Sequence, residues 1–172
     1  MYLNKLKILA VCLLIPGTAF ANNPSDIPSV PSIAALESLG AASSQYPVIN
    51  VQGYYAQGDG FSSTFIWSGA STATATVCGP FQATAVTTGR WVSQNSVSLR
   101  GCGAKGDGTT NDSSAINAAL AINLPITVEK GNYLIGSALT IPSNTNISCK
   151  PGAAFLYDAN GSFYPFSPHL IS

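Results

Sequence analysis

Short alternations of apolar and polar residues cover much of this chain, and such alternation is typical of half-buried β-strands. Between residues 47 and 98 the alternating pieces are separated by turns that contain glycine, as in Gln57–Gly60. Short strands joined by such turns predict a small antiparallel β-module over residues 47–98. The predicted strands are Val48–Val51, Thr64–Trp67, Thr72–Val77 and Arg90–Val92.

The same region carries a group of aromatic side chains. Aromatic residues have large apolar areas to bury, so we expect this group to form the core of the module. The alternative is that their rings line a face on which sugars stack. The group consists of Tyr54, Tyr55, Phe61, Phe65, Trp67, Phe81 and Trp91.

A helical spacing replaces the alternation in the segment Gly103–Leu120. Apolar residues recur there three and four positions apart, which predicts a short amphipathic helix that buries one stripe against a larger body. The pattern stops before Pro125, because proline cannot continue a helix. The predicted stripe consists of Ala115, Ile116, Ala119 and Leu120.

A glycine-rich turn leads into this helix. Glycines on both sides of Asp107 permit positive φ, and the side chain of Asn111 or Asp112 can accept bonds from the free N–H groups of the first helical turn. Oxygen ligands near a tight turn also suit calcium, but the spacing differs from that of an EF-hand loop, so we predict turn-forming and capping roles. The predicted structural residues are Gly106, Asp107, Gly108, Asn111 and Asp112.

From residue 126 onward, strand-like pieces of three or four residues alternate with turns that contain Gly, Asn or Pro. The coils of a β-solenoid have this pattern. A meander of β-hairpins has the same pattern, so turn composition alone leaves both architectures open. The predicted strands are Ile126–Glu129, Tyr133–Ile135, Leu139–Ile141, Asn146–Cys149 and Ala154–Tyr157.

Two sets of motifs carry a resemblance to a known family. The segment Gly103–Leu120 resembles the opening of the pectate-lyase-like right-handed parallel β-helix family. The preceding order of Gly53–Gly60, Thr64–Trp67 and Gly89–Trp91 resembles the leading region of phage tailspikes and related bacterial β-helix proteins. The resemblance favours the solenoid. It implies a mainly β chain in which a small antiparallel β-module precedes the capping helix and first coils of a right-handed parallel β-helix, residues 99–172.

The resemblance also implies where the chemistry of such proteins lies. The lyases of this family hold calcium with acidic residues, and its hydrolases use paired aspartates, in both cases on coils beyond the cap. The acidic residues of this chain are scattered singly. We therefore predict no catalytic residue, no metal site and no cofactor here. A chain that ends after about two coils would be a truncated and inactive fragment, because a solenoid stacks its core coil on coil.

Composition adds information mainly at the N-terminus. Lys5 and Lys7 precede a short apolar run, and Ala19–Ala21 forms a small-x-small cleavage site, which together predict a signal peptide over residues 1–21. The apolar run is too short to span a bilayer. Residues 22–46 are rich in proline and serine and predict a linker with one or two helical turns. We expect a secreted protein, extracellular or periplasmic, with no membrane attachment after cleavage.

The net charge limits the classes of binding partner, and the cysteine count limits the possible disulfides. After cleavage, five basic residues remain against seven acidic ones, which argues against nucleic-acid and anionic-lipid partners. Three cysteines remain, so at least one thiol is unpaired within the chain. Cys102 and Cys149 each border a predicted strand, and we predict a disulfide between them. The alternative is that all three are small buried apolar side chains.

Together these observations predict a secreted, polysaccharide-directed protein that resembles the N-terminal part of a pectate-lyase-like enzyme. In this hypothesis the chain by itself is an incomplete fragment without activity. An alternative is a tailspike-like module that binds glycans or serves as a structural adhesin. A third hypothesis is a complete small protein that forms a homo-oligomer through the open end of the β-helix. The sequence leaves the glycan and the type of reaction open.

Overall fold

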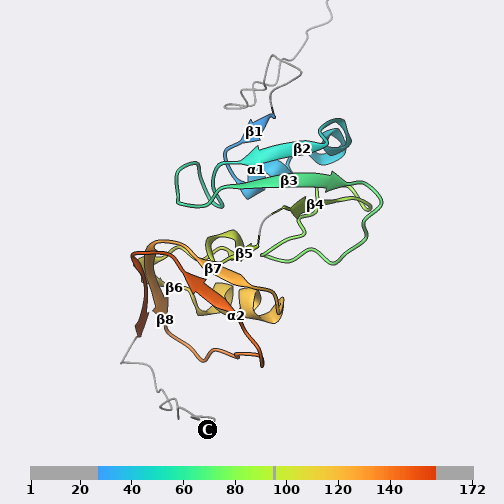
Figure 1. Cartoon of the computed structure of the whole chain (residues 1–172). Coiled ribbons are helices and arrows are strands. Elements are labelled where there is room, and N and C mark those ends of the chain that lie inside the picture. Colours follow the sequence, from blue (N-terminus) through green and yellow to red (C-terminus); the bar gives the residue numbers. More distant parts are fainter. Residues whose placement is uncertain (1–26, 95, 158–172) are drawn as a thin grey trace, which may run out of the picture.

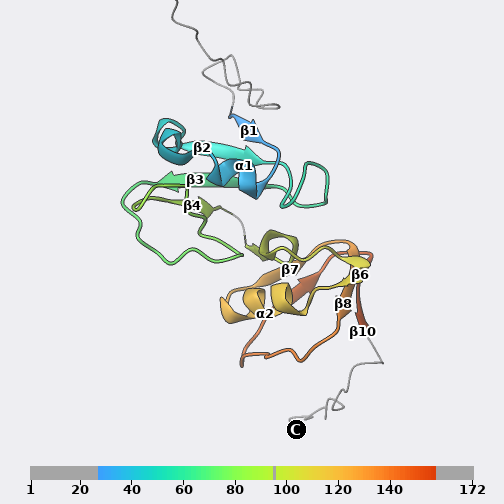
Figure 2. The same ribbon diagram turned by 180° about the vertical axis from the view of Figure 1, so that it is seen from behind.

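The computed structural model of this 172-residue chain describes residues 27–94 and 96–157. The predicted signal peptide, residues 1–21, lies outside the described residues. Figure 1 shows two units, one above the other, and Figure 2 shows the same arrangement from behind. We call residues 27–94 the β-module and residues 96–157 the stacked unit. Within the described residues, no helix is long and apolar enough to cross a membrane.

The β-module is built on a four-stranded sheet with the order β1-β2-β3-β4. The second and third strands, and the third and fourth, pair antiparallel, while the first pairs parallel to the second. Trp67 lies opposite Trp91 in this register, and the predicted alternation turns Ile49 and Phe65 into the core. The strands are β1 (Ser29–Val30), β2 (Val48–Val51), β3 (Ser63–Ser68) and β4 (Arg90–Ser93).

The predicted linker is wrong from residue 27 onward. Residues 27–46 form β1, the helix α1 (Ile33–Glu37) and the 3-10 helix η1 (Gly40–Gln45), all part of the β-module. Val30 and Leu36 are buried in its core, and the hydroxyl of Ser32 caps α1 by accepting from the Ala35 N–H at 3.2 Å. Proline and serine suggested a tether, but the few apolar residues between them have enough area to pack onto the sheet.

The strand predicted over Thr72–Val77 is also wrong. This stretch is an exposed loop between β3 and β4. Its small Thr and Ala side chains bury little apolar area, and the outer edge of β4 is paired instead by Phe81, which bridges to Trp91. The loop is held at Ala73, whose carbonyl oxygen accepts from Nε of the buried Arg90 at 2.7 Å.

The stacked unit contains two three-stranded sheets, both entirely parallel. Parallel pairing of strands this short excludes the hairpin meander, which would give antiparallel pairs. One sheet contains β5 (Val97–Ser98), β7 (Ile126–Val128) and β9 (Ile147–Cys149). The other contains β6 (Asp107–Asn111), β8 (Gly131–Ile135) and β10 (Ala153–Tyr157).

The strand predicted over Leu139–Ile141 is wrong for a specific reason. The side chain of Asn117 bonds the backbone of this stretch: its Nδ2 donates to the Ala138 carbonyl at 3.0 Å, and its Oδ1 accepts from the Thr140 N–H at 2.8 Å. Those backbone groups are then unavailable for a ladder. The stretch is therefore a loop.

One strand was not predicted: β6 forms inside the segment that its glycines had marked as a turn.

The predicted amphipathic helix is confirmed as α2 (Ser113–Ala121), which lies beside β7 in Figures 1 and 2. All four residues of its predicted stripe are buried. They pack in one core with Leu99, Val128 and Tyr133. A nine-residue helix is marginal alone in water, so this packing stabilises it. The 3-10 helix η2 (Arg100–Cys102) precedes the glycine-rich turn.

Candidate functional site

The predicted turn residues hold the start of the stacked unit together. Asp112 is almost fully buried, and its two carboxylate oxygens accept from the Lys105 and Gly106 N–H groups at 2.8 and 3.1 Å. It stands at the N-cap position of α2 but makes no side-chain capping bond. Asn111 caps instead, since its Oδ1 accepts from the Ser113 N–H at 3.0 Å. The two residues predicted as alternatives therefore have different roles.

Asp107 organises the tip of the same turn. Its Oδ1 accepts from the N–H groups of Thr109 and Thr110 at 2.9 and 2.7 Å, and the Thr110 hydroxyl donates to its Oδ2 at 2.8 Å. These bonds favour the ionised form and hold the pKa of the Asp107 carboxyl well below its usual range. The carboxylate is exposed, so its bonds order the turn and contribute nothing to the core.

Gly106 is required by geometry on two counts. Its φ of +60° is in the left-handed region, and a Cβ there would lie 2.9 Å from the Tyr133 ring. Gly108 has a φ of +78° but more room, with the nearest atom 3.4 Å from a Cβ. Each carboxylate of the turn is already bonded by its own backbone. No group of three His, Cys, Asp or Glu residues that could hold a metal ion occurs within residues 27–94 and 96–157. What the structure shows for Asp107 and Asp112 is that their carboxylates order the backbone of the turn.

Arg100 connects this turn to the β-module. Its Nη1 donates to the carbonyl oxygens of Asp59 and Lys105 at 2.6 and 2.8 Å, and its Nη2 donates to that of Lys130 at 2.9 Å. The guanidinium carbon lies 5.9 Å from the centre of the Tyr133 ring. One side chain thus joins the β-module, the glycine-rich turn and the turn between β7 and β8.

The predicted Cys102–Cys149 disulfide is wrong. Cys102, in η2, pairs with Cys78 on the loop between β3 and β4, and Cys149 is an exposed free thiol. Cys149 lies on the outer strand β9, in register with Val128 of β7. Next to Cys78, the Tyr54 hydroxyl donates to the Val77 carbonyl at 2.9 Å and holds the same loop. The disulfide is a second link between the two units.

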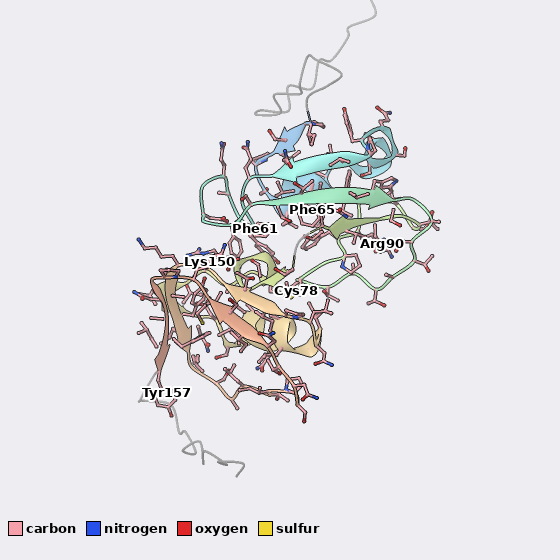
Figure 3. All side chains as sticks on the ribbon, in the orientation of Figure 1. Phe61, Phe65, Cys78, Arg90, Lys150 and Tyr157 are labelled. Atoms are coloured by element: carbon pink, nitrogen blue, oxygen red, sulfur yellow. A yellow bond between two sulfur atoms is a disulfide. The ribbon has the colours of Figure 1, made fainter. Side chains whose placement is uncertain are left out.

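A cavity of about 340 Å³ lies between the β-module and the stacked unit. Figure 3 labels four of its lining residues, Phe61, Phe65, Cys78 and Lys150, where the two units meet. Phe61, Phe65 and Phe81 supply aromatic walls, and Glu129 and Lys150 supply one charge of each sign. The remaining polar lining is a set of hydroxyl groups from Ser62, Ser63, Ser93, Ser96, Ser98 and Thr127.

Several of these hydroxyls form hydrogen bonds with a neighbouring group of the lining. The hydroxyls of Ser63 and Ser93 are 2.9 Å apart, and those of Ser96 and Thr127 are 3.3 Å apart. The Ser98 hydroxyl accepts from the Gly101 N–H at 2.9 Å. Sequence reasoning missed this cavity because its lining comes from several segments that share no motif. The clustering of serines around the ends of the predicted strands was the signal available.

A second, more open groove of about 570 Å³ lies on the β-module, between α1 and the loop before Cys78. Burial raises the pKa of Glu37 on its wall. Burial is also the main cause that raises the pKa of Tyr54 to about 12, with smaller contributions from Tyr55 and Glu37. The aromatic group predicted as core is buried at Phe61, Phe65, Phe81 and Trp91, as expected, whereas Tyr55 is 55% exposed.

Comparison with known protein families gives a match that covers the stacked unit. Residues 96–171 match the family described as rhamnogalacturonase A/epimerase, pectate lyase-like. This part of the chain belongs to the pectate lyase-like family. A stretch of 52 residues, 30% of the chain, is also 38% identical to the preneck appendage protein of Bacillus phage PZA and spans 6% of that protein.

Solved structures extend the likeness beyond this part to most of the chain. The tailspike protein gp49 of Acinetobacter baumannii bacteriophage Fri1, a capsular polysaccharide depolymerase, aligns with 73% of the chain at 18% identity and a TM-score of 0.57. Tailspike protein 4 of bacteriophage CBA120 aligns with 81% at 16% identity and a TM-score of 0.56. WceF of Pantoea stewartii, a glycan biofilm modifying enzyme with a tailspike-like parallel β-helix fold, aligns with 79% at 17% identity and a TM-score of 0.57.

At these identities the likeness shows the fold, which is that of the tailspike parallel β-helix proteins. The chain spans only 19–23% of the length of the three solved chains. What those proteins bind and cleave therefore concerns this chain only as a proposal.

Proposed function

We propose that this chain is the leading part of a longer, secreted, polysaccharide-directed β-helix protein, with the β-module followed by the first coils. The proposal also holds that the chain by itself does not cleave polysaccharide. The family of the stacked unit and the tailspike fold support the polysaccharide connection. One observation carries the proposal that further coils follow, namely the exposed apolar side chains on the outer strands β9 and β10.

The register of the parallel sheets makes this observation specific. Ile147 of β9 follows Ile126 of β7, and Phe155 of β10 follows Tyr133 of β8, each facing the same side as its buried partner. Ile126 and Tyr133 are at most 2% exposed, whereas Ile147 and Phe155 are 42% and 41% exposed among the described residues. In a solenoid, the next coil covers the inward side chains of the previous one. We therefore propose that a further coil covers Ile147 and Phe155.

The test compares this chain with a longer product of the same gene. We expect the reading frame after Ser172 to continue with strand-like repeats, and the extended protein to lower the viscosity of an acidic or neutral bacterial polysaccharide. The 172-residue chain should leave the viscosity unchanged. Depolymerisation by the short chain would contradict the proposal, and so would an extended protein whose outer strands stay as exposed to hydrogen exchange as in the short chain.

Secretion is a separate part of the proposal, since residues 1–21 carry the signal-peptide pattern. Expression in a bacterial host with export should give a mature protein that begins at Asn22, as read by N-terminal sequencing of the periplasmic or culture fraction. A protein that stays in the cytoplasm with Met1 retained would contradict secretion and leave the polysaccharide proposal standing.

A glycan-binding or structural adhesin module is the second candidate. The exposed ring of Tyr55 beside the open groove with Glu37 favours it, because aromatic faces and carboxylates both suit sugar ligands. Retention on immobilised polysaccharide without cleavage, lost in a Tyr55→Ala variant, would support this candidate. Homo-oligomers formed through the apolar outer strands would instead cover Ile147 and Phe155 in a dimer, which sedimentation would detect.

A further inference from the structure

We propose that the cavity between the β-module and the stacked unit binds one neutral, polyhydroxylated ring, such as a single sugar residue. The cavity is made entirely from described residues of the two units, so this site needs no further coil. Binding in this cavity therefore does not depend on the proposed function.

The size and walls of the cavity suit a ring of this kind. Its volume of about 340 Å³ lies at the lower end of the range of roughly 300–1,000 Å³ that small-molecule pockets occupy. Phe61, Phe65 and Phe81 are at most 8% exposed and belong to one buried apolar cluster, with the rings of Phe65 and Phe81 in edge contact at 5.5 Å between centroids. They present an apolar wall against which the C–H face of a ring can pack.

The polar side of the cavity selects a ligand that both donates and accepts. A hydroxyl has one donor and two lone pairs, so the Ser96–Thr127 pair, which shares one bond, keeps one donor and several lone pairs for a ligand. The Ser98 hydroxyl uses a lone pair for the Gly101 N–H and keeps its own hydrogen. Ring hydroxyls can both donate to and accept from such groups, whereas a bare metal ion binds only their lone pairs and an anion only accepts from their hydrogens.

The charges in the lining favour a neutral ligand. Glu129 and Lys150 carry opposite signs and offset each other, and the hydroxyls add none. A ligand with a net charge would meet repulsion from one of the two, while sugar hydroxyls can donate to the carboxylate and accept from the ammonium. The cavity therefore lacks the single-sign field that an anionic or cationic ligand requires.

The experiment titrates the full chain, labelled with ¹⁵N, with galactose and separately with myo-inositol. We expect saturable shifts of the Ser98, Gly101 and Thr127 amides. The variant Thr127→Val keeps the shape of the side chain but removes its hydroxyl, and it should weaken binding about five- to tenfold, the value of one or two hydrogen bonds. The matched control Thr140→Val, on the exposed loop after β8, should bind as the natural chain does.

Several outcomes would overturn the inference. One is that neither galactose nor myo-inositol shifts the cavity amides. Another is that Thr127→Val, with an amide spectrum that matches the natural chain, binds with the same affinity. Tighter binding of galacturonate, lost in Lys150→Met, would assign the cavity to an anionic ligand. If Thr127→Val fails to fold, Ser96→Ala removes the other hydroxyl of the same pair and carries the same expectation.

Discussion

The indole Nε1 of Trp91 donates to the hydroxyl of Ser43 at 3.2 Å, and both side chains are fully buried. The bond connects β4 to η1, two segments that are 48 residues apart in the chain. Tryptophan in a core needs a partner for its N–H, and here the partner comes from a stretch whose composition suggested a linker. Residues 27–46 are therefore an integral part of the β-module.

Replacing Ser43 with alanine should destabilise the protein by about 1–3 kcal/mol, because the Trp91 N–H would be left buried without a partner. Chemical denaturation followed by tryptophan fluorescence measures this. Ser44→Ala is the matched control: its hydroxyl is exposed and donates to the Ala41 carbonyl, so the change should stay within about 0.5 kcal/mol. Equal effects of the two variants would mean that the Trp91 bond contributes nothing.

Replacing Asp112 with alanine should cost about 2–4 kcal/mol, since two backbone N–H groups of the glycine-rich turn would lose a charged acceptor in a buried site. Asp112→Asn keeps one acceptor oxygen and should cost less. Urea denaturation gives both values. Faster hydrogen exchange at Lys105 and Gly106 should accompany the loss, and unchanged exchange there would contradict the role assigned to Asp112.

Asp107 should make stability depend on pH in acid. Its pKa in the folded chain lies below the usual value of 3.8, so the folded state binds this proton less readily than the unfolded state. The stabilisation from its turn bonds is complete above pH 3.8 and is lost as the pH falls further below that value. The melting temperature should fall over that range, and Asp107→Asn should make the fall shallower. An identical acid profile in the variant would rule out this contribution.

Removing the disulfide with the double variant Cys78→Ala and Cys102→Ala should lower stability by about 3 kcal/mol, because the bond closes a loop with a sequence separation of 24. Cys149→Ala should have little effect. Peptide mapping without reduction should recover residue 78 linked to residue 102. A peptide that links Cys102 to Cys149 would contradict the structure and restore the pairing predicted from the sequence.

Local patterns predicted the elements whose cause is local. The alternation in Val48–Val51 and the helical stripe ending at Leu120 each follow from the geometry of a single element. Two strands were predicted wrongly where the neighbours decided: Thr72–Val77 has no ladder partner, and the side chain of Asn117 takes the backbone groups near Leu139–Ile141. Nothing within either stretch distinguishes it from a real strand.

The sequence by itself determined that this chain is mainly β, where the amphipathic helix α2 lies, and that a glycine-rich turn precedes it, because periodicity and turn chemistry act over a few residues. Tertiary structure decided which cysteine pairs with Cys102, and how serines and phenylalanines from separate segments line one cavity. These outcomes depend on contacts between residues distant in the chain. Such contacts form only when the β-module and the stacked unit pack together, and no short-range pattern encodes them.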